Sequence, residues 1–356
     1  MNKIMSIFLI LSTSLFGAKI LHVSFHRGCL NEIEYIARML GHEITSLMVQ
    51  DFQPKAFDGC SQGNELYNMS HNRAENTWKL HQDYFKQFDA IITSDTAPLS
   101  RIFLQNGWDK PLIIWVCNRF DYRHGNAQDF PDQEYYNLFA QATRLPHVRV
   151  ISYCPFETFF MRSKGIQIHN KVIKPCASPH VTTSSIIPSH VKKEETFFLP
   201  PYHNETACNV SKLCQNLGIK TYHGRYNGPS DLQHFKGIIH LPYAWSNFAF
   251  FENMQLGIPY FVPTIKFLRT LHRTQPNYFF QDQRYMFTEH HHELAEFYCP
   301  EYKDIIVYFD SWDDLRKKIK TTHYDTLRKK IRKKAAEHQK TMLSHWKNTF
   351  DELKII

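Results

Sequence analysis

The residues best suited to binding an anion lie in the segment 238–263, IIHLPYAWSNFAFFENMQLGIPYFVP. Its pattern predicts a strand, a loop, a helix, a glycine stop and a second strand. Asn247 is a favourable N-cap, and free backbone N–H groups at Ser246, Asn247 and Phe248 would suit a diphosphate at the helix N-terminus. Glu252 follows among apolar neighbours and needs a partner there, either the two hydroxyls of a ribose or a cation in a helix salt bridge.

Cationic residues that could neutralise a bound phosphate follow two other expected strands. Arg225 comes after one strand end, and Gly224 beside it leaves room for a close approach. Arg27 and Gly28 follow the first strand and could reach the same ligand from the other half of the chain. The alternative for Arg225 is a surface loop arginine. Two cations after a later strand are second choices: Lys266 and Arg269.

Two residues of the N-terminal half are candidates for a catalytic base. His26 ends the first strand, and a histidine there has a pKa near working pH, unless it only holds the loop backbone. Asp121 in WVCNRFDYR follows another strand. It could act as the base instead, or pair with Arg119 or Arg123. Asp95 also follows a strand, where it could simply cap the next helix.

The elements that must position these residues alternate between apolar runs and helical patterns. One helix is expected from Asn31 to Leu40, where Gly41 stops it. Strands of the N-terminal half are expected at Ile20–Phe25, Ile44–Val49, Ala90–Ser94, Leu112–Cys117 and Val148–Ser152. The alternation indicates βα units and a parallel sheet.

The segment Ala177–Glu195 is rich in Ser, Thr, Pro and charge, and we interpret it as a linker. A second alternating series follows it, with strands at Thr196–Leu199, Ile219–His223, Gly237–Leu241, Pro259–Val262 and Ile305–Phe309. The sequence therefore predicts an α/β protein of two tandem Rossmann-like domains facing across a cleft. Ligands of such sheets bind at the carboxyl ends of the strands, so that cleft is the expected site.

Composition agrees with this division. The chain has 356 residues, which at about 150 residues per domain favours two domains. Hydrophobic residues make up 43% and charged residues 21%, which excludes a disordered chain. The eight cysteines contain no CxxC pair, which excludes a zinc ribbon. The net charge of +8 favours anionic ligands.

Two further segments bear on location and partners. Residues 1–18 combine Lys3, an apolar run and small residues, which predicts a signal peptide or a membrane anchor and hence a secretory or membrane-associated protein. The basic residues between Arg316 and Lys334 interleave with apolar residues at helical spacing. That pattern is typical of a solvated helix face, and no nucleic-acid partner is expected; a membrane surface is the alternative if the leader is an anchor.

The segment 238–263 resembles the donor-site motif of GT-B glycosyltransferases of the glycogen-synthase-like, group 1 type. Leu241-Pro242, Glu252 and Gly257-Ile258-Pro259 stand in the family's places. The N-terminal SFHRGCLNEIEYIARMLGHEI is similar to the family's first strand, ligand loop and helix. The resemblance implies an acceptor domain at 19–180, a nucleotide-sugar domain at 195–322, and C-terminal helix residues 323–356 that pack back on the first domain.

The resemblance implies transfer of a sugar from a nucleotide-sugar donor to the hydroxyl of a glycan, lipid or protein, with no further cofactor. Ala244 stands where many retaining members carry a first glutamate, so stereochemistry cannot be carried over. The chain has no Asp-x-Asp metal motif, which implies a metal-independent reaction with cationic side chains on the leaving diphosphate. The alternative that Ala244 favours is a non-catalytic sugar- or nucleotide-binding protein of the same fold.

Overall fold

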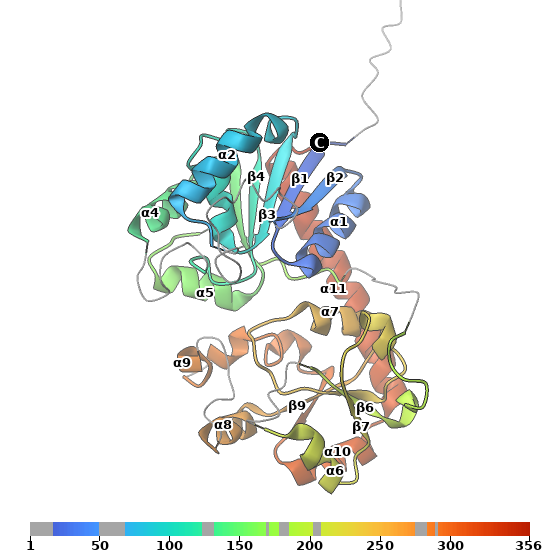
Figure 1. The fold of residues 1–356 in the computed structure, drawn as a ribbon. Coiled ribbons are helices and arrows are strands. Elements are labelled where there is room, and N and C mark those ends of the chain that lie inside the picture. The colour runs from blue at the N-terminus through green and yellow to red at the C-terminus, as the bar shows by residue number, and fades with distance from the viewer. Residues whose placement is uncertain are drawn as a thin grey trace, which may run out of the picture.

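The computed structural model describes residues 17–49, 68–122, 132–168, 171–177, 185–201, 208–274, 283–288 and 291–356. These residues form two separate parallel sheets of five strands each. Each sheet has helices packed beside it, and the two α/β units lie one above the other in Figure 1. The predicted pair of tandem Rossmann-like units is therefore confirmed.

The N-terminal sheet has the strand order β2-β1-β3-β4-β5. Its strands are β1 (Lys19–Ser24), β2 (Glu43–Met48), β3 (Ala90–Asp95), β4 (Leu112–Val116) and β5 (Val148–Ser152). The helices are α1 (Arg27–Leu40), α2 (His71–Phe85), α3 (Arg101–Leu104), α4 (Gln133–Ala142) and α5 (Pro155–Ser163). β4 is buried along its whole length, as expected for a central parallel strand covered on both faces.

The C-terminal sheet has the order β10-β9-β8-β6-β7. Its strands are β6 (Phe197–Leu199), β7 (Thr221–His223), β8 (Gly237–Ile239), β9 (Tyr260–Pro263) and β10 (Ile306–Phe309). The helices are α6 (Val210–Asn216), α7 (Phe248–Gln255), α8 (Ile265–Thr274), α9 (Gln283–Met286) and α10 (Trp312–Thr321). In both sheets the chain reverses its direction of strand addition between the first and third strand, which is where open parallel sheets bind ligands.

A long final helix, α11 (Tyr324–Glu352), contacts both units. Near its start Arg328 donates to the backbone carbonyls of Phe235 and Lys236 at 2.6 and 3.2 Å. Near its end Trp346 packs edge-on against Trp115 of β4, with ring centroids 5.7 Å apart. Figure 1 shows α11 running from the C-terminal unit up to the N-terminal unit.

Helix α1 begins four residues earlier than the sequence pattern predicts. The carbonyl of His26 accepts from the backbone N–H groups of Cys29 and Leu30, so the helix starts directly after the strand. Arg27 and Gly28, expected in a loop, therefore form its first turn. The predicted stop is confirmed, since Gly41 takes the left-handed conformation at φ 83°.

The linker Ala177–Glu195 contains one short 3-10 turn, Lys193–Glu195, among the residues described there. The predicted leader, residues 1–18, lies outside the described residues except for Gly17 and Ala18. None of the helices in the described ranges is long and apolar enough to cross a membrane.

Candidate functional site

A cavity of about 370 Å³ lies between the two units, at the carboxyl ends of β1, β3 and β4. The N-terminal unit supplies His26, Gly28, Cys29, Asp95, Cys117, Asn118 and Tyr153 to its wall. The C-terminal unit supplies Tyr226, Tyr243, Ser246, Asn247, Phe248, Ala249 and Glu252. The structure thus brings together five residues that the sequence predicted for one site: His26, Gly28, Ser246, Asn247 and Glu252.

The N-terminus of α7 forms one side of this cavity. Asn247 is its N-cap, as predicted, and the side-chain oxygen accepts from the backbone N–H of Phe250 at 2.9 Å. The hydroxyl oxygen of Ser246 is buried beside Tyr153, which interacts with it, and among the described residues it has no hydrogen bond of good geometry. The first backbone N–H groups of the helix have no partner within the helix itself, so this end of α7 offers donors to an anion.

Phe248, in the first turn of α7, reaches across to the N-terminal unit. Its ring is stacked on the ring of His26 at a centroid distance of 5.8 Å. It also contacts the rings of Tyr153, at 5.1 Å, and Trp115, at 5.9 Å. Phe248 therefore aligns the N-terminus of α7 with the strand ends of the other sheet.

Gly28 leaves space for the His26 ring. A Cβ atom at position 28 would lie 2.8 Å from Cε1 and 3.0 Å from Nδ1 of His26. A carbon atom is not accommodated at that distance unless the ring moves. The glycine thus allows the imidazole to fold back over the first turn of α1 and face the cavity.

His26 is coupled to a thiol that the sequence analysis did not select. The hydrogen bond with Cys29 is the largest influence on His26, and together with the charges of Cys29, Asp95 and Glu252 it raises the pKa of His26 to about 9. Burial acts to raise the pKa of Cys29, but hydrogen bonds from Cys117 and His26 outweigh burial and lower it to about 5. At neutral pH the two residues form a thiolate–imidazolium pair, whereas the sequence predicted a His26 pKa near working pH.

Asp95 lies between these groups in a strained conformation. Its φ of 70° is in the left-handed region, which a residue other than glycine rarely adopts. Asn118 holds it there, because its side-chain amide donates to the Asp95 carboxylate at 2.7 Å and its backbone N–H donates to the Asp95 carbonyl at 3.1 Å. Strained residues of this kind concentrate at ligand sites.

Glu252 faces the cavity from the third position after Ala249 in α7. Burial raises its pKa to about 7, while His26 acts in the opposite direction. The protonated form of this carboxyl group is therefore more populated at neutral pH than in an exposed glutamate. A ligand that donates hydrogen bonds to it would favour the charged form.

Four of the predicted site residues do not line this cavity. Asp121 accepts a hydrogen bond from the Tyr136 hydroxyl. Arg27, in the first turn of α1, and Arg225 are exposed, and Gly224 packs below the Tyr222 hydroxyl. Their assigned roles stay predictions.

Comparison with solved structures shows three chains of similar architecture. A UGT transferase from Siraitia grosvenorii in complex with UDP is 10% identical, with 94% of this chain and 100% of that chain covered at a TM-score of 0.51. Arabidopsis thaliana UGT89C1 complexed with UDP is 12% identical, with 95% and 98% covered at a TM-score of 0.48. A UDP-N-acetylglucosamine 2-epimerase is 11% identical, with 88% and 91% covered at a TM-score of 0.46. No protein-family model matches the chain, and no curated protein matches its sequence.

The chain has the GT-B fold. The first of these structures carries the assignment, because the whole of that chain is covered at a TM-score above 0.5. The resemblance stated from the donor-site motif is thereby confirmed at the level of the fold. At this identity the likeness does not extend to substrate or reaction.

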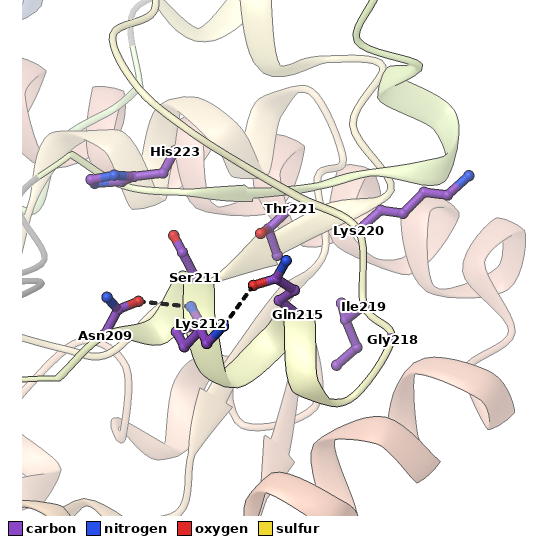
Figure 2. Close-up of a pocket in the computed structure, with 9 residues that line it drawn as sticks. All are labelled: Asn209, Ser211, Lys212, Gln215, Gly218, Ile219, Lys220, Thr221 and His223. Carbon is purple, nitrogen blue, oxygen red and sulfur yellow. Dashed lines mark hydrogen bonds between the residues drawn. The ribbon is translucent and has the colours of Figure 1, made fainter.

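A larger hollow of about 710 Å³ lies elsewhere on the GT-B molecule, along α6 and β7 (Figure 2). Its polar side chains bond to one another: the Asn209 oxygen accepts from the backbone N–H of Lys212 at 2.7 Å, and Lys212 Nζ donates to Gln215 at 3.4 Å. No residue predicted for the site lines it. The smaller cavity between the units is therefore the better candidate.

The described ranges hold no group of three His, Cys, Asp or Glu residues that could bind a metal ion. His290, the first residue of the run His290–His292, lies outside those ranges.

Proposed function

We propose that the protein is a glycosyltransferase that moves a sugar from a nucleotide-sugar donor to an acceptor hydroxyl. One observation carries the proposal: a single cavity joins His26 and Asp95 of one unit to the N-terminus of α7 and Glu252 of the other. The fold supports it, because the similar Siraitia grosvenorii protein is a UGT transferase solved with UDP.

In this proposal the C-terminal unit holds the nucleotide. The N-terminal N–H groups of α7 and the Ser246 hydroxyl receive the diphosphate, and Glu252 accepts hydrogen bonds from the ribose hydroxyls. Arg225 is exposed beside Tyr226, which lines the cavity, and is assigned to the leaving diphosphate. Arg27 offers a second cation from the first turn of α1. The negative charge is neutralised by these groups without a metal ion.

The reaction needs a base for the acceptor. The acceptor oxygen attacks the anomeric carbon, the bond to the diphosphate breaks, and the hydroxyl proton passes to His26. Because Cys29, Asp95 and Glu252 raise the His26 pKa, the ring must first lose a proton to serve as this base. Asp121 is the alternative base, and it would have to exchange its hydrogen bond with Tyr136 for one to the acceptor.

The acceptor is proposed to be a hydroxyl of a glycan, lipid or protein, and the proposed setting is secretory or membrane-associated, as the sequence of residues 1–18 predicts. A second candidate function is binding of a sugar or nucleotide without catalysis. The protonated state of His26 and the residue Ala244 favour it.

A nucleotide panel tests the first step. Thermal unfolding is measured with UDP, GDP and CMP, and one of them should raise the midpoint in wild type and raise it less in Glu252→Gln. Glu194→Gln, which replaces an exposed glutamate, is the matched control and should respond as wild type does. The absence of any shift with all three nucleotides would overturn the proposal.

Donor hydrolysis and transfer then separate catalysis from binding alone. A protein that binds the nucleotide but neither hydrolyses nor transfers the matching sugar is the non-catalytic alternative. Arg225→Ala should lower turnover more than it lowers nucleotide affinity, because the charge on the leaving group grows towards the transition state. An unchanged turnover would mean that Arg225 is a surface loop arginine with no role in the reaction.

A further inference from the structure

Two cysteines meet in the wall of the cavity. Cys29 lies in the first turn of α1 and Cys117 directly follows β4, and their sulfur atoms are 3.9 Å apart. Both side chains line the cavity, with Cys29 buried and Cys117 half-buried. Both are free thiols in this structure. A disulfide bond of about 2.05 Å would require the sulfur atoms to approach by roughly 2 Å.

The surroundings favour reaction at Cys29. The thiolate is the reactive form of cysteine, and it forms beside a cationic histidine. Cys29 Sγ lies within hydrogen-bond distance of Cys117 Sγ at 3.9 Å, and His26 also bonds to Cys29, while the Cys117 thiol donates to the Trp115 carbonyl at 3.6 Å. The Cys117 pKa is raised by burial and by the Cys29 thiolate, so the proton of the pair stays on Cys117. This is the arrangement of an attacking thiolate with a resolving thiol beside it.

We propose that Cys29 and Cys117 form a reversible disulfide when a peroxide enters the cavity. The Cys29 thiolate attacks one oxygen of hydrogen peroxide, the O–O bond breaks, and the released hydroxide takes a proton to become water. The sulfur of Cys117 then attacks the Cys29 sulfenic acid, its proton leaves with the departing hydroxyl as a second water, and the S–S bond closes. Two thiols are oxidised and one peroxide is reduced; a dithiol reductant restores the pair.

The disulfide has a consequence for His26. Oxidation removes the thiolate that bonds to the ring, and burial then acts against only the weaker influence of the Asp95 and Glu252 charges. The pKa of His26 should therefore fall on oxidation, so that the ring becomes neutral at a lower pH. The redox state of this pair would set the charge beside the N-terminus of α7. The disulfide itself does not depend on the proposed activity.

Mass mapping of the full chain tests the disulfide. The protein is treated with hydrogen peroxide, remaining thiols are blocked, and the digest is searched for linked peptides. We expect a peptide joining Cys29 to Cys117 that disappears after dithiothreitol. Cys154→Ala, which replaces a buried thiol outside the cavity wall, should give the same link; Cys117→Ala should stop at the sulfenic acid of Cys29. A link from either residue to another cysteine, or neither thiol reacting before Cys154, would overturn the proposal.

Ring titration by nuclear magnetic resonance tests the coupling to His26. The His26 pKa should fall in the oxidised wild type and fall similarly in reduced Cys29→Ala. Reduced Cys154→Ala should keep the value of reduced wild type. If Cys29→Ala does not fold, the comparison of oxidised with reduced wild type decides alone. An unchanged His26 pKa after the disulfide has formed would refute the coupling. A protein that shows both effects without transferring sugar would retain this inference and refute the proposed function.

Discussion

At the scale of single residues, His26 shares the cavity with Cys29, Asp95 and Glu252, and these groups influence one another's protonation. His26 carries a positive charge at neutral pH because the Cys29 thiolate, Asp95 and Glu252 surround it. Glu252 in turn is partly protonated because burial outweighs the attraction of His26. Changing any one of these groups should therefore change the titration of the others.

Glu252→Gln should weaken nucleotide binding by about tenfold, because a carboxylate that accepts two hydroxyl hydrogen bonds contributes on the order of 1.5–3 kcal/mol. The same substitution should increase the free energy of unfolding at high pH. The raised Glu252 pKa means that the folded protein binds more protons than the unfolded chain between about pH 4.5 and 7, so this group's contribution is lost as pH rises through that window. The glutamine variant should then be more stable than wild type at pH 8, by at most about 2 kcal/mol.

Urea unfolding at pH 4 and pH 8, paired with calorimetry of nucleotide binding, measures both effects of the substitution. Wild type and Glu252→Gln should have the same free energy of unfolding at pH 4, where wild-type Glu252 is protonated. Tight nucleotide binding by a folded Glu252→Gln protein would show that Glu252 is not the ribose ligand.

Two substitutions of Asp95 distinguish the effect of its charge from the effect of its left-handed backbone conformation. Asp95→Asn should keep the fold, since asparagine tolerates φ 70°, and should lower the His26 pKa because one negative charge is lost. Asp95→Ala should lose the same charge and also the hydrogen bond from the Asn118 side chain, and the unfavourable backbone alone should destabilise the protein by about 1–2 kcal/mol. Ring titration and urea unfolding of the two variants measure these effects separately. Equal stability of both variants would mean that the left-handed conformation costs nothing here.

At the scale of elements, the order of strands and helices along the chain was predictable, whereas some of their ends and the contacts between them were not. The alternation of apolar runs placed His26, Asp95 and Glu252 correctly at strand ends or in the expected helix. Cys29 and Cys117 were missed because they meet across the intervening strand β3, and sequence spacing does not reveal that distance. Phe248 was missed as a contact because an aromatic residue in a helix gives no sign of reaching another domain.

Asp121 shows a limit of the same rule. It follows β4 as predicted, yet it lies five residues beyond the strand, where the chain has turned and Tyr136 of α4 donates to it. Asn118, two residues beyond the strand, reaches the cavity instead. Position after a strand therefore predicts a place at the cavity for a residue close to the strand end, such as Asn118, but not for Asp121 further along the loop.

Gly257 fixes the packing of α7 against α11. It ends α7 at φ 71°, and a Cβ atom there would lie 2.9 Å from Cγ of Arg332 and 3.0 Å from the carbonyl oxygen of Arg328. Gly257→Ala should therefore destabilise the protein by about 1–2 kcal/mol from the backbone alone, and by more from the clash. Gly107→Ala, with a similar φ of 73° and open space around its Cβ, is the control that carries only the backbone cost. Equal losses of unfolding free energy in the two variants would show that α11 shifts to accommodate the new Cβ atom with no further loss of stability.

At the scale of the whole molecule, several contacts hold the two units in one arrangement. The rings of Phe156 and Trp245 stack at 3.7 Å with an angle of 2° between them. Trp245 is itself held within the C-terminal unit, where its carbonyl accepts from the backbone N–H of Glu296 at 2.8 Å. Any opening of the cavity to admit a ligand between the units has to separate some of these contacts.

A buried ion cluster lies at the same junction. Lys174 is 3.2 Å from Glu296, which is fully buried, and 2.7 Å from Glu301. Burial acts to lower the Lys174 pKa, but the two carboxylates hold it above its ordinary value. Burial also acts on Glu301, and His338 and Lys174 outweigh it, so its pKa lies well below the usual range. The Glu296 pKa is raised by burial despite Lys174.

Lys174→Met should therefore be one of the most damaging single substitutions in the chain. Removing the cation leaves the buried Glu296 carboxyl without its ion-pair partner, which costs about 3–5 kcal/mol for a buried pair. The depressed Glu301 pKa gives wild type a contribution that is present above about pH 4.5 and lost as pH falls, and the variant lacks it. The difference between the two proteins should thus be large at pH 7 and shrink at pH 4, where Glu296 binds a proton.

Urea unfolding at both pH values measures this difference, and Lys330→Met is the matched control. Lys330 pairs with Asp304 at 3.1 Å on the surface, where such a pair contributes about 0–1 kcal/mol. Adding Glu296→Gln to Lys174→Met should recover part of the loss at pH 7, because the second substitution replaces the unpaired carboxyl. If Lys174→Met loses no more unfolding free energy than Lys330→Met at pH 7, the cluster does not hold the two units together. The contact between the units then depends on the Phe156–Trp245 stack and on α11.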